Sequence, residues 1–482
     1  MRDFVEVRRG AYHDSVTLMR VSRALGGLAG VGEAMAAMAT DLNLRTLADL
    51  GFAVPDDAGP ADLVVAVRAD GEYALDGVQE ALDGVLDARP APGGGGDGLP
   101  GGDVPPRTVA SAAARAEATV ALVSVPGPHV FPEAMDALDA GLNVMIFSDN
   151  VPVAQEVALK EAAARRGLIV MGPDCGTAVV GGAGLGFANA VRPGPVGVVA
   201  ASGTGAQQVM CLLDAAGTGV SHVLGVGGRD LSPEVSGRSA LTALKALDAD
   251  PATGLIVVVS KPPAPRVADL IREAARRLDT PVVFALPGPG EDDLTQAVER
   301  ALALLGLPVP DWPCWPAPRA RARPGGGALR GLFAGGTLRD EAALIAGAAL
   351  GWDLEAAGHR LVDFGDDAYT RGRAHPMIDP ALRLAALAEH AADPACGALL
   401  LDVVLGHGAD PDPAAALAPA LASALERRPD LAAVVSLCGV PGDPQDRDRQ
   451  AAALRDAGAA VFASNAQAAR HAVRLAEGGG GG

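Results

Sequence analysis

Apolar and polar residues follow a regular rhythm along this chain, in which short apolar runs alternate with amphipathic segments of helical length. The apolar runs are four to seven residues long and rich in Val, Leu and Ile, which predicts strands. The predicted strands are 63–68, 120–125, 143–147, 168–171, 196–200, 222–226, 255–260, 281–285, 329–334, 360–364, 398–404, 432–437 and 459–463. Near-continuous apolar strands that alternate with helices are typical of parallel sheets covered on both faces, so the fold class is α/β.

Two stretches interrupt this rhythm. Residues 88–107 are rich in Gly and Pro and are expected to form an exposed insertion loop, and residues 310–327 contain five prolines and are expected to be an interdomain linker. We therefore expect three parallel-sheet domains at 1–192, 193–309 and 328–477, followed by a disordered glycine tail at 478–482.

Charge and composition narrow the range of possible functions. The net charge of -19 would repel a phosphate backbone, which excludes nucleic acid as a partner but leaves room for local sites that bind small anions. The N-terminus has no apolar signal sequence, and no apolar run is long enough to cross a bilayer, so we expect a cytoplasmic protein without a membrane partner. Five scattered cysteines without a C-x-x-C pair, and eight histidines without H-E-x-x-H, predict no metal site built from these residues.

The second and third predicted domains resemble each other. Residues 196–213 and 329–345 each contain an apolar strand, a small-residue turn with Gly-Thr, and an amphipathic helix, and the later strands follow in the same order. This repetition predicts an internal duplication. The alternative is that two unrelated flavodoxin-like domains share a common rhythm.

The repeated turn is the first candidate for chemistry. In Ser202-Gly203-Thr204 a strand end leads through small residues into a helix, whose free N–H groups and dipole attract an anion. Gly335-Gly336-Thr337 repeats this arrangement. We expect both turns to bind a phosphate or carboxylate, although tight turns between strand and helix need glycine for packing in any case.

Further candidates follow the next strands, where ligands of open α/β sheets bind. Gly227 and Gly228 lead to Arg229, which could bind a carboxylate or phosphate through two parallel hydrogen bonds, and Lys261 follows a buried strand. Arg229, Lys261 and His375 are the candidate catalytic residues, with His375 as a candidate for proton transfer. The alternative for each is an ordinary solvated loop residue.

The loop of the third domain that corresponds to Gly227–Asp230 is strongly polar. Its acidic and basic residues would suit a polyanionic substrate, which Mg²⁺ could accompany. They are Asp363, Asp366, Asp367, Arg371 and Arg373, of which the two arginines are predicted substrate ligands. A polar surface loop is the alternative.

The turn Gly172-Pro173-Asp174-Cys175 ends the last strand of the first predicted domain. Gly and Pro fix a tight turn there, and its backbone is expected to line a ligand. Cys175 has no evident base within its own motif, so we do not expect it to act as a nucleophile.

These segments resemble the FdrA family. The resemblance rests on GPDCGT (172–177), VVAASGTGAQQV (198–209), GVGGRDL, VSKPPA, LFAGGTL and GDDAYTRGRAHPMIDP, and it covers nearly the whole chain. More distantly, the first two domains resemble the α-subunit of succinyl-CoA synthetase, which has a Rossmann-like CoA-binding domain and a flavodoxin-like ligase domain. The third domain resembles the flavodoxin-like ligase domain of the β-subunit. The resemblance implies that the two Gly-Thr turns face each other across one anionic site and that residues 172–175 belong to a cofactor site.

The chain departs from succinyl-CoA synthetase at three places. The segment after strand 281–285 has no counterpart of the phosphorylated histidine, Gln208 replaces a carboxylate after the first Gly-Thr turn, and residues 8–16 replace the glycine-rich CoA loop. The ATP-grasp domain is also missing. The resemblance therefore implies a phosphate-binding scaffold without a phosphohistidine relay, and it leaves CoA as an unproven cofactor.

FdrA-type proteins are associated with a carbamoyltransferase that acts on oxamate, or on oxalurate plus phosphate, in allantoin catabolism together with partner subunits. The resemblance implies the same role here, with small anionic substrates such as carbamoyl phosphate. Two alternatives stay open. One is an acyl-CoA synthetase of the succinate-CoA ligase type, and the other is a non-catalytic scaffold or sensor subunit.

Overall fold

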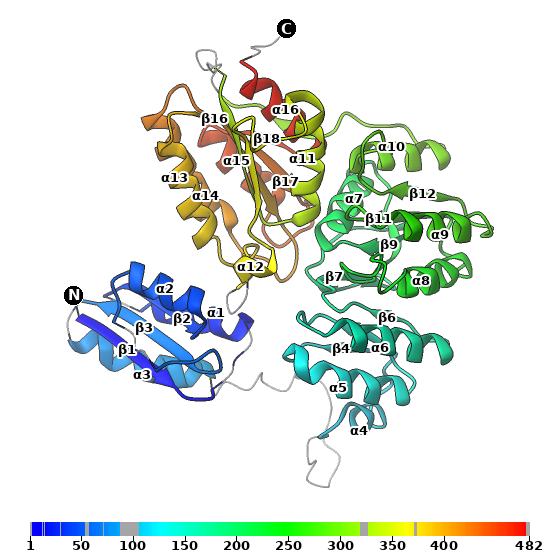
Figure 1. Ribbon diagram of the computed structural model, residues 1–482, viewed down its shortest axis with the longest axis horizontal. Coiled ribbons are helices and arrows are strands. Elements are labelled where there is room, and N and C mark those ends of the chain that lie inside the picture. The colour runs from blue at the N-terminus through cyan, green and yellow to red at the C-terminus, as the bar shows by residue number, and fades with distance from the viewer. Residues whose placement is uncertain are drawn as a thin grey trace. The chain divides into compact units, whose positions relative to one another are not determined.

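A computed structural model describes residues 2–11, 13, 15–28, 30–53, 57–70, 72–86, 106–318, 326–370 and 374–478. The chain forms two compact units, coloured along the sequence in Figure 1. The N-terminal unit comprises 1–105 and 366–379, and the large unit comprises 106–365 and 380–482. Most of the predicted insertion loop, part of the predicted linker and residues 479–482 of the predicted tail lie outside the described residues.

The N-terminal unit is a three-stranded sheet in the order β1-β3-β2, with all pairs antiparallel. Its elements are β1 (Arg2–Arg8), α1 (Ser15–Gly26), β2 (Val31–Met38), α2 (Asp41–Asp49), β3 (Leu63–Ala69), α3 (Glu72–Leu86) and α12 (Asp367–Thr370). The prediction that 63–68 is a strand is confirmed, but the expectation that it belongs to a parallel sheet is wrong.

Side chains of β3 alternate between two cores. Leu63, Val65 and Val67 pack in one cluster with apolar residues of α1 and α3, whereas Val64 and Ala66 pack in another with Leu47 of α2 and with Phe52. A central strand with apolar residues on both faces explains why its sequence resembles a parallel strand. The outer strand β1 carries four charged residues and β2 consists mostly of Ala, Gly and Met, so neither shows the run of Val, Leu and Ile from which strands were predicted.

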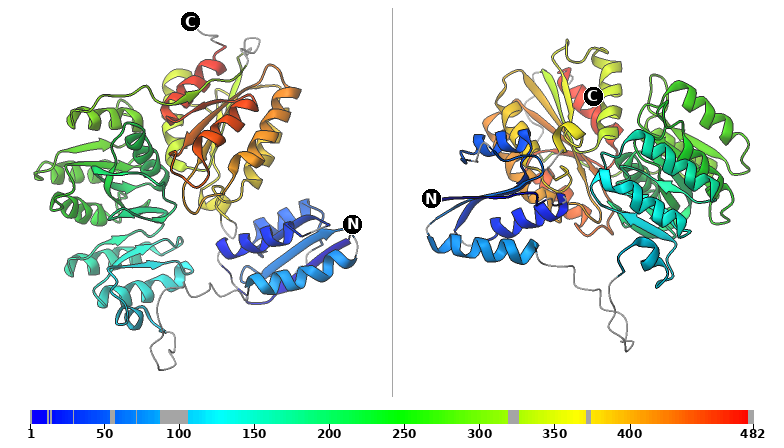
Figure 2. Two further views of the ribbon diagram at one scale, coloured as in Figure 1. Left: turned by 180° about the vertical axis from the view of Figure 1, so that it is seen from behind. Right: turned by 60° about the horizontal axis from the view of Figure 1, so that its bottom comes forward.

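The large unit begins with a three-stranded parallel sheet in the order β4-β5-β6. Its elements are α4 (Val109–Ala113), β4 (Val120–Val123), α5 (Gly127–Asp139), β5 (Asn143–Ile146), α6 (Val153–Arg165) and β6 (Val170–Met171). Met145 and Met171 pack in the same core as Leu244 of the following lobe, and α6 contacts α8 (Figure 2).

The first lobe is built on the sheet β12-β11-β9-β10-β7-β8. The strands β12, β11, β9 and β10 are parallel to one another, and β7 is antiparallel to both of its neighbours, β10 and β8. Helices α7 and α10 cover one face and α8 and α9 cover the other (Figure 1). Its elements are β7 (Thr177–Val180), β8 (Ala183–Gly186), β9 (Pro193–Ala201), α7 (Gly203–Ala215), β10 (Val220–Gly225), α8 (Arg238–Asp248), β11 (Leu255–Ser260), α9 (Pro265–Ala275), β12 (Val282–Ala285) and α10 (Leu294–Leu304).

The second lobe is built on the sheet β13-β18-β17-β16-β14-β15, in which only β13 is antiparallel among the described strands. Its elements are β13 (Cys314–Trp315), β14 (Ala328–Phe333), α11 (Gly336–Leu350), β15 (Arg360–Asp363), α13 (Ala381–Ala392), β16 (Cys396–Val404), α14 (Pro413–Arg427), β17 (Ala432–Cys438), α15 (Arg447–Asp456), β18 (Ala460–Phe462) and α16 (Asn465–Ala476). Helices α11 and α16 pack together on the side that faces the first lobe (Figure 1).

Both lobes place their first parallel strand between their second and third, with the fourth strand beyond the third. This shared order supports the predicted duplication. All thirteen predicted strands are present, within a few residues at each end. The predicted boundaries at 192 and 309 stay predictions, since the two lobes and the three-stranded parallel sheet form one compact unit. No helix in the described part of the chain combines the length and the apolar character needed to cross a membrane.

Candidate functional site

The two lobes meet at the two Gly-Thr turns. Ser202 is the N-cap of α7, where its hydroxyl accepts a hydrogen bond from the Gly205 amide at 2.9 Å. The same hydroxyl lies 2.6 Å from Oγ1 of Thr337, in the first turn of α11. Both residues are buried, so the starts of α7 and α11 face each other through one short hydroxyl–hydroxyl hydrogen bond. The implied meeting of the two turns is therefore observed.

Two glycines permit this close approach. A Cβ on Gly335 would lie 2.7 Å from Oγ1 of Thr204, and a Cβ on Gly205 would lie 3.1 Å from Cγ2 of Thr337. Each lobe thus places a threonine against a glycine of the other lobe. The predicted need for small residues at the turns has a packing reason as well as a ligand-binding one.

A side chain of the protein already fills part of the second turn. Asp402, in the middle of β16, accepts hydrogen bonds from the amides of Ala334 at 2.7 Å and Gly335 at 2.8 Å. Arg383 of α13 lies 3.1 Å from the Asp402 carboxylate and also donates to the Asp402 carbonyl. Gly335 gives its amide to Asp402, so this N–H group is already used within the protein, and the predicted role of Gly335 in anion binding stays a prediction.

The accessible part of the second turn lies at Gly336. A Cβ at this position would be 2.5 Å from Oδ2 of Asp363 and 3.0 Å from Nζ of Lys261. Lys261 follows β11 of the first lobe and is exposed, whereas Asp363 ends β15 of the second lobe and is largely buried. Because Gly336 has no side chain, a cation of one lobe and a carboxylate of the other both approach the start of α11, and their atoms fill the space that a Cβ would need. We call this meeting point of Gly336, Lys261 and Asp363 the gap at Gly336. The N–H groups of Gly336 and Thr337 at this gap have no carbonyl partner within their own helix.

Burial governs the protonation of the carboxyl groups here. It raises the pKa of Asp363 to about 6, and the Asp402 charge adds to the effect, while the Gly365 hydrogen bond and the Lys261 and Arg339 charges oppose it. Burial also raises the pKa of Asp402, against the Arg383 charge and two backbone hydrogen bonds. Below about pH 6 the accessible gap therefore loses a negative charge.

Gln208 and Glu341 occupy equivalent positions, each five residues after the middle glycine of its turn. Gln208 donates to the Ala463 carbonyl just before α16, and Glu341 accepts from the Leu294 amide at the start of α10. Each side chain thus reaches the last helix of the opposite lobe. Burial raises the pKa of Glu341 to about 7, with the charge of Asp293 as the next cause. Sequence inspection missed Glu341, although the duplication pointed to it.

The loop after β12, where the sequence has no counterpart of a phosphorylated histidine, borders a small cavity of about 190 Å³. The loop residues Pro287–Asp293 form one wall, and Glu341, Trp352 and Arg470 line the other side. Arg470 forms an ion pair with Asp293 there. The expected absence of a phosphohistidine loop thus coincides with a cavity between the lobes.

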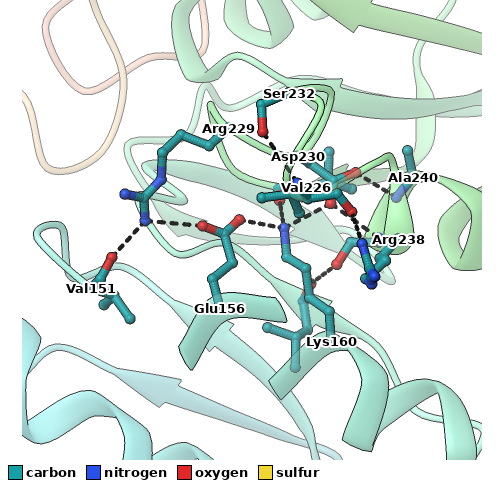
Figure 3. Close-up of polar contacts among 12 residues, drawn as sticks. Val151, Glu156, Lys160, Val226, Arg229, Asp230, Ser232, Arg238 and Ala240 are labelled. Carbon is teal, nitrogen blue, oxygen red and sulfur yellow. Dashed lines mark hydrogen bonds and ion pairs between the residues drawn. The ribbon is translucent and has the colours of Figure 1, made fainter. Parts of the chain in front are cut away.

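Arg229, whose side chain is 43% exposed, pairs with a buried cluster of charged residues, shown in Figure 3. Its guanidinium donates to the Val151 carbonyl at 2.8 Å and lies 2.9 Å from the carboxylate of Glu156 in α6. Lys160, one turn further along α6, lies 2.8 Å from the other oxygen of Glu156 and 2.7 Å from Asp230. The predicted catalytic arginine is therefore engaged with the protein in this structure.

The same cluster fixes the loop after β10. Lys160 also donates to the Val226 carbonyl at 2.9 Å, and Asp230 accepts from the Ser239 and Ala240 amides at the start of α8. Two positive and two negative side chains balance one another, and Lys160 uses three donors on three acceptors. Buried charges are tolerated when they are paired and hydrogen-bonded in this way.

The predicted turn at 172–175 packs against the Gly227 loop. A Cβ on Gly227 would collide with the Pro173 carbonyl, and one on Gly228 would lie 3.4 Å from the Asp174 carboxylate. The sequence motifs Gly172–Cys175 and Gly227–Gly228 are thus neighbours. Cys175 itself is buried and burial raises the pKa of its thiol to about 12, so its side chain packs in the core rather than lining a ligand.

The remaining candidates lie outside the described residues or belong to the N-terminal unit. Arg371 and Arg373 lie outside the described residues. His375 belongs to the N-terminal unit, where its Nδ1 accepts a hydrogen bond from the Met377 amide at 3.2 Å. Residues 8–16, expected in place of a CoA loop, also belong to the N-terminal unit rather than to the sheet β4-β5-β6, which corrects that assignment.

Comparison with known proteins identifies relatives for most of the chain. A family model described as "AllF, heavy metal-associated domain" matches residues 1–99, and one described as "CoA-ligase" matches 332–475. The uncharacterized protein YahF of Escherichia coli (strain K12) is 36% identical, with 96% of each chain covered. The α-subunit 2 of an ADP-forming succinate–CoA ligase of Archaeoglobus fulgidus is 30% identical over 38% of this chain and 63% of its own length.

Two solved structures show weaker likeness. The ATP citrate lyase of Methanothrix soehngenii, in complex with citrate and coenzyme A, has a TM-score of 0.33 and 21% identity over 42% of this chain and 38% of that chain. A dinucleotide-forming acetyl-coenzyme A synthetase 1 of Ca. Korarchaeum cryptofilum has a TM-score of 0.28 and 17% identity over 77% of this chain and 86% of that chain.

A heavy metal would need ligands that residues 1–99 do not provide. Soft metals favour thiolate and imidazole ligands, but the first cysteine of the chain is Cys175 and the segment has one histidine, His13. After β1, the Gly10 amide instead donates to one carboxylate oxygen of Asp62 at 2.8 Å, and the Gly59 amide donates to the other oxygen. Among the described residues, no cluster of three potential ligands could hold a metal. The cysteine and histidine content of residues 1–99 therefore does not fit a heavy-metal site built on thiolate and imidazole ligands.

The buried cluster yields a stability prediction. Lys160→Met leaves Glu156 and Asp230 buried with a single cation, Arg229, so we expect a loss of about 3–5 kcal/mol in the free energy of unfolding. Urea denaturation measures this loss. Lys245→Met, at an exposed position of α8, is the matched control and should change stability by less than about 0.5 kcal/mol. Equal effects of the two changes would contradict the assigned role of Lys160.

The gap at Gly336 yields a binding prediction. Gly336→Ala places a methyl group between Asp363 and Lys261, so we expect the binding of a small anion such as phosphate to weaken at least about tenfold, or about 1.4 kcal/mol. Isothermal titration calorimetry measures the affinity. Gly254→Ala, where a Cβ meets its nearest neighbour at 3.6 Å, is the control. Unchanged affinity in Gly336→Ala would place the anion elsewhere.

Proposed function

The chain belongs to the family of the Escherichia coli protein YahF, and we propose that it is a phosphate-handling carbamoyltransferase subunit that interconverts oxalurate plus phosphate with oxamate plus carbamoyl phosphate. The observation that carries the proposal is the meeting of the two helix starts, with Lys261 and Asp363 across the gap at Gly336. This gap offers helix N–H groups and one exposed ammonium group to a small anion. The FdrA resemblance supplies the choice of substrate.

The proposed site favours an acyl phosphate over a phosphorylated side chain. The segment 286–293 contains no histidine, so it offers no imidazole to carry a phosphoryl group between the two turns. A phosphate held at Gly336 by Lys261 and the start of α11 could instead leave directly from a bound carbamoyl group. Positioned donors that meet the charge of the departing phosphate would supply much of the rate enhancement.

A second candidate is an acyl-CoA synthetase. The match of residues 332–475 to a CoA-ligase model and the similarity to a succinate–CoA ligase α-subunit favour it. The parallel sheet β4-β5-β6 and the turn at 172–175 would then belong to a CoA site. The two candidates share the anion gap at Gly336 and differ in whether a thiol or a nitrogen attacks the acyl carbon.

The first candidate predicts phosphorolysis of oxalurate by this chain when it is purified with the partner subunits that co-purify with it. The products should be oxamate and carbamoyl phosphate, measured by chromatography and by coupled phosphate consumption. Lys261→Met should raise the KM for phosphate about 10- to 100-fold, because one charge-assisted hydrogen bond is lost. No turnover by the complete set of subunits would rule out the transferase.

The second candidate predicts CoA binding. Calorimetry with the full chain should give a dissociation constant below about 1 mM, which corresponds to a binding free energy of about 4 kcal/mol. Since Gly172–Asp174 would line the CoA site, Asp174→Ala should change that affinity, whereas Asp269→Ala, at an exposed position of α9, should not. If CoA shows no heat of binding at this concentration while oxalurate is turned over, the ligase candidate is excluded.

A further inference from the structure

We propose that Asp363 is the catalytic base of the transfer, accepting the proton that the attacking nitrogen loses. This inference rests on the proposed transferase function and adds to it the residue that handles the proton. The sequence suggested His375 for this role, but the described structure places that histidine in the N-terminal unit.

The backbone directs one oxygen of Asp363 toward the gap. Asp363 pairs with Phe333 in the β14–β15 ladder, three residues before Gly336. Its Oδ1 accepts the Gly365 amide at 2.8 Å, which fixes the orientation of the carboxyl group. Its Oδ2 lies 2.5 Å from the position that a Cβ of Gly336 would occupy, so this oxygen faces the start of α11.

The surrounding charges suit a proton acceptor. Lys261 from the end of β11 and Arg339 from α11 favour the carboxylate, as does Arg383 of α13, which lies close enough to interact with it electrostatically. Asp402 of β16 opposes ionisation. Burial is the largest influence and raises the pKa to about 6. Asp363 is thus ionised at neutral pH yet more basic than an exposed aspartate, as general bases often are.

The other buried carboxylates of the site have their oxygens engaged elsewhere. Asp402 accepts the amides of Ala334 and Gly335. Glu341 accepts from Leu294 with one oxygen and from Asn465 with the other, at 2.7 Å each. Asp340 of α11, which also lies in the field of Lys261, pairs with Arg339 at 3.0 Å. Among the described residues around the gap, Asp363 therefore presents the carboxylate oxygen best placed for a substrate proton.

The chemical step balances with these groups alone. The amide nitrogen of oxamate attacks the carbonyl carbon of carbamoyl phosphate and a C–N bond forms. The C–O bond to phosphate breaks, and phosphate leaves with the electron pair of that bond, next to Lys261 and the start of α11. The proton of the attacking nitrogen passes to Oδ2 of Asp363. In the reverse direction the protonated carboxyl group returns this proton to the departing oxamate nitrogen.

The test compares Asp363→Asn with the wild-type chain in the complete complex, with transfer rates measured between about pH 5 and pH 9. A base must be ionised, so the wild-type rate should rise about tenfold per pH unit up to about pH 6 and then level off. Asp363→Asn should lower the rate about 10²- to 10⁴-fold and abolish this rise, while carbamoyl phosphate still binds within about threefold of wild type. Asp269→Asn, at an exposed position of α9, is the control and should retain both the rate and the pH profile.

The outcomes separate this inference from the function on which it rests. A wild-type complex without carbamoyl transfer removes both proposals. An active wild type with an unchanged Asp363→Asn variant removes the base alone. If Asp363→Asn loses carbamoyl phosphate binding together with activity, Asp363 positions the ligand and the inference is also overturned. Retained binding with a lost pH-dependent rise supports it.

Discussion

The short hydrogen bond between Ser202 and Thr337 joins the starts of two helices that belong to different sheets. Everything in the candidate site depends on this contact, because Lys261 comes from one lobe and Asp363 from the other. The contact is possible only where the turns are almost free of side chains. Helix starts carry partial positive charge and would repel each other without compensation. The hydroxyl pair and the buried Asp402 carboxylate provide that compensation within the protein.

The distribution of buried charge separates what is fixed from what is available to a ligand. Arg229, Glu156, Lys160 and Asp230 satisfy one another, and Arg383 satisfies Asp402, so these groups stabilise loops and turns (Figure 3). Lys261 is different because its ammonium group lies beside Gly336 at the start of α11. A net charge of -19 over the whole chain therefore does not prevent a single cationic position from binding an anion. What matters is the local balance of charge at the start of α11.

Much of this arrangement could be predicted from the sequence, because apolar periodicity identifies buried parallel strands and the repeated Gly-Thr turns identify their helix starts. The antiparallel N-terminal unit could not, since its outer strand β1 is half charged, its outer strand β2 is mostly Ala, Gly and Met, and its central strand is apolar on both faces. Asp402 carried a signal that was overlooked, a lone carboxylate inside the apolar run of β16. The pairing of Arg229 with α6 depends on packing between distant segments, which spacing along the chain does not reveal.

The N-terminal unit is assembled from two pieces of chain, 1–105 and 366–379. The second piece departs directly after Asp363 and Gly365 and returns at Pro380. Because a ribosome releases the chain from its N-terminus, the first piece emerges long before its complement is made. The N-terminal unit therefore reaches its full set of contacts only after the whole first lobe has been synthesised. When the N-terminal unit is completed during translation, the strand that ends in Asp363 has therefore already been synthesised.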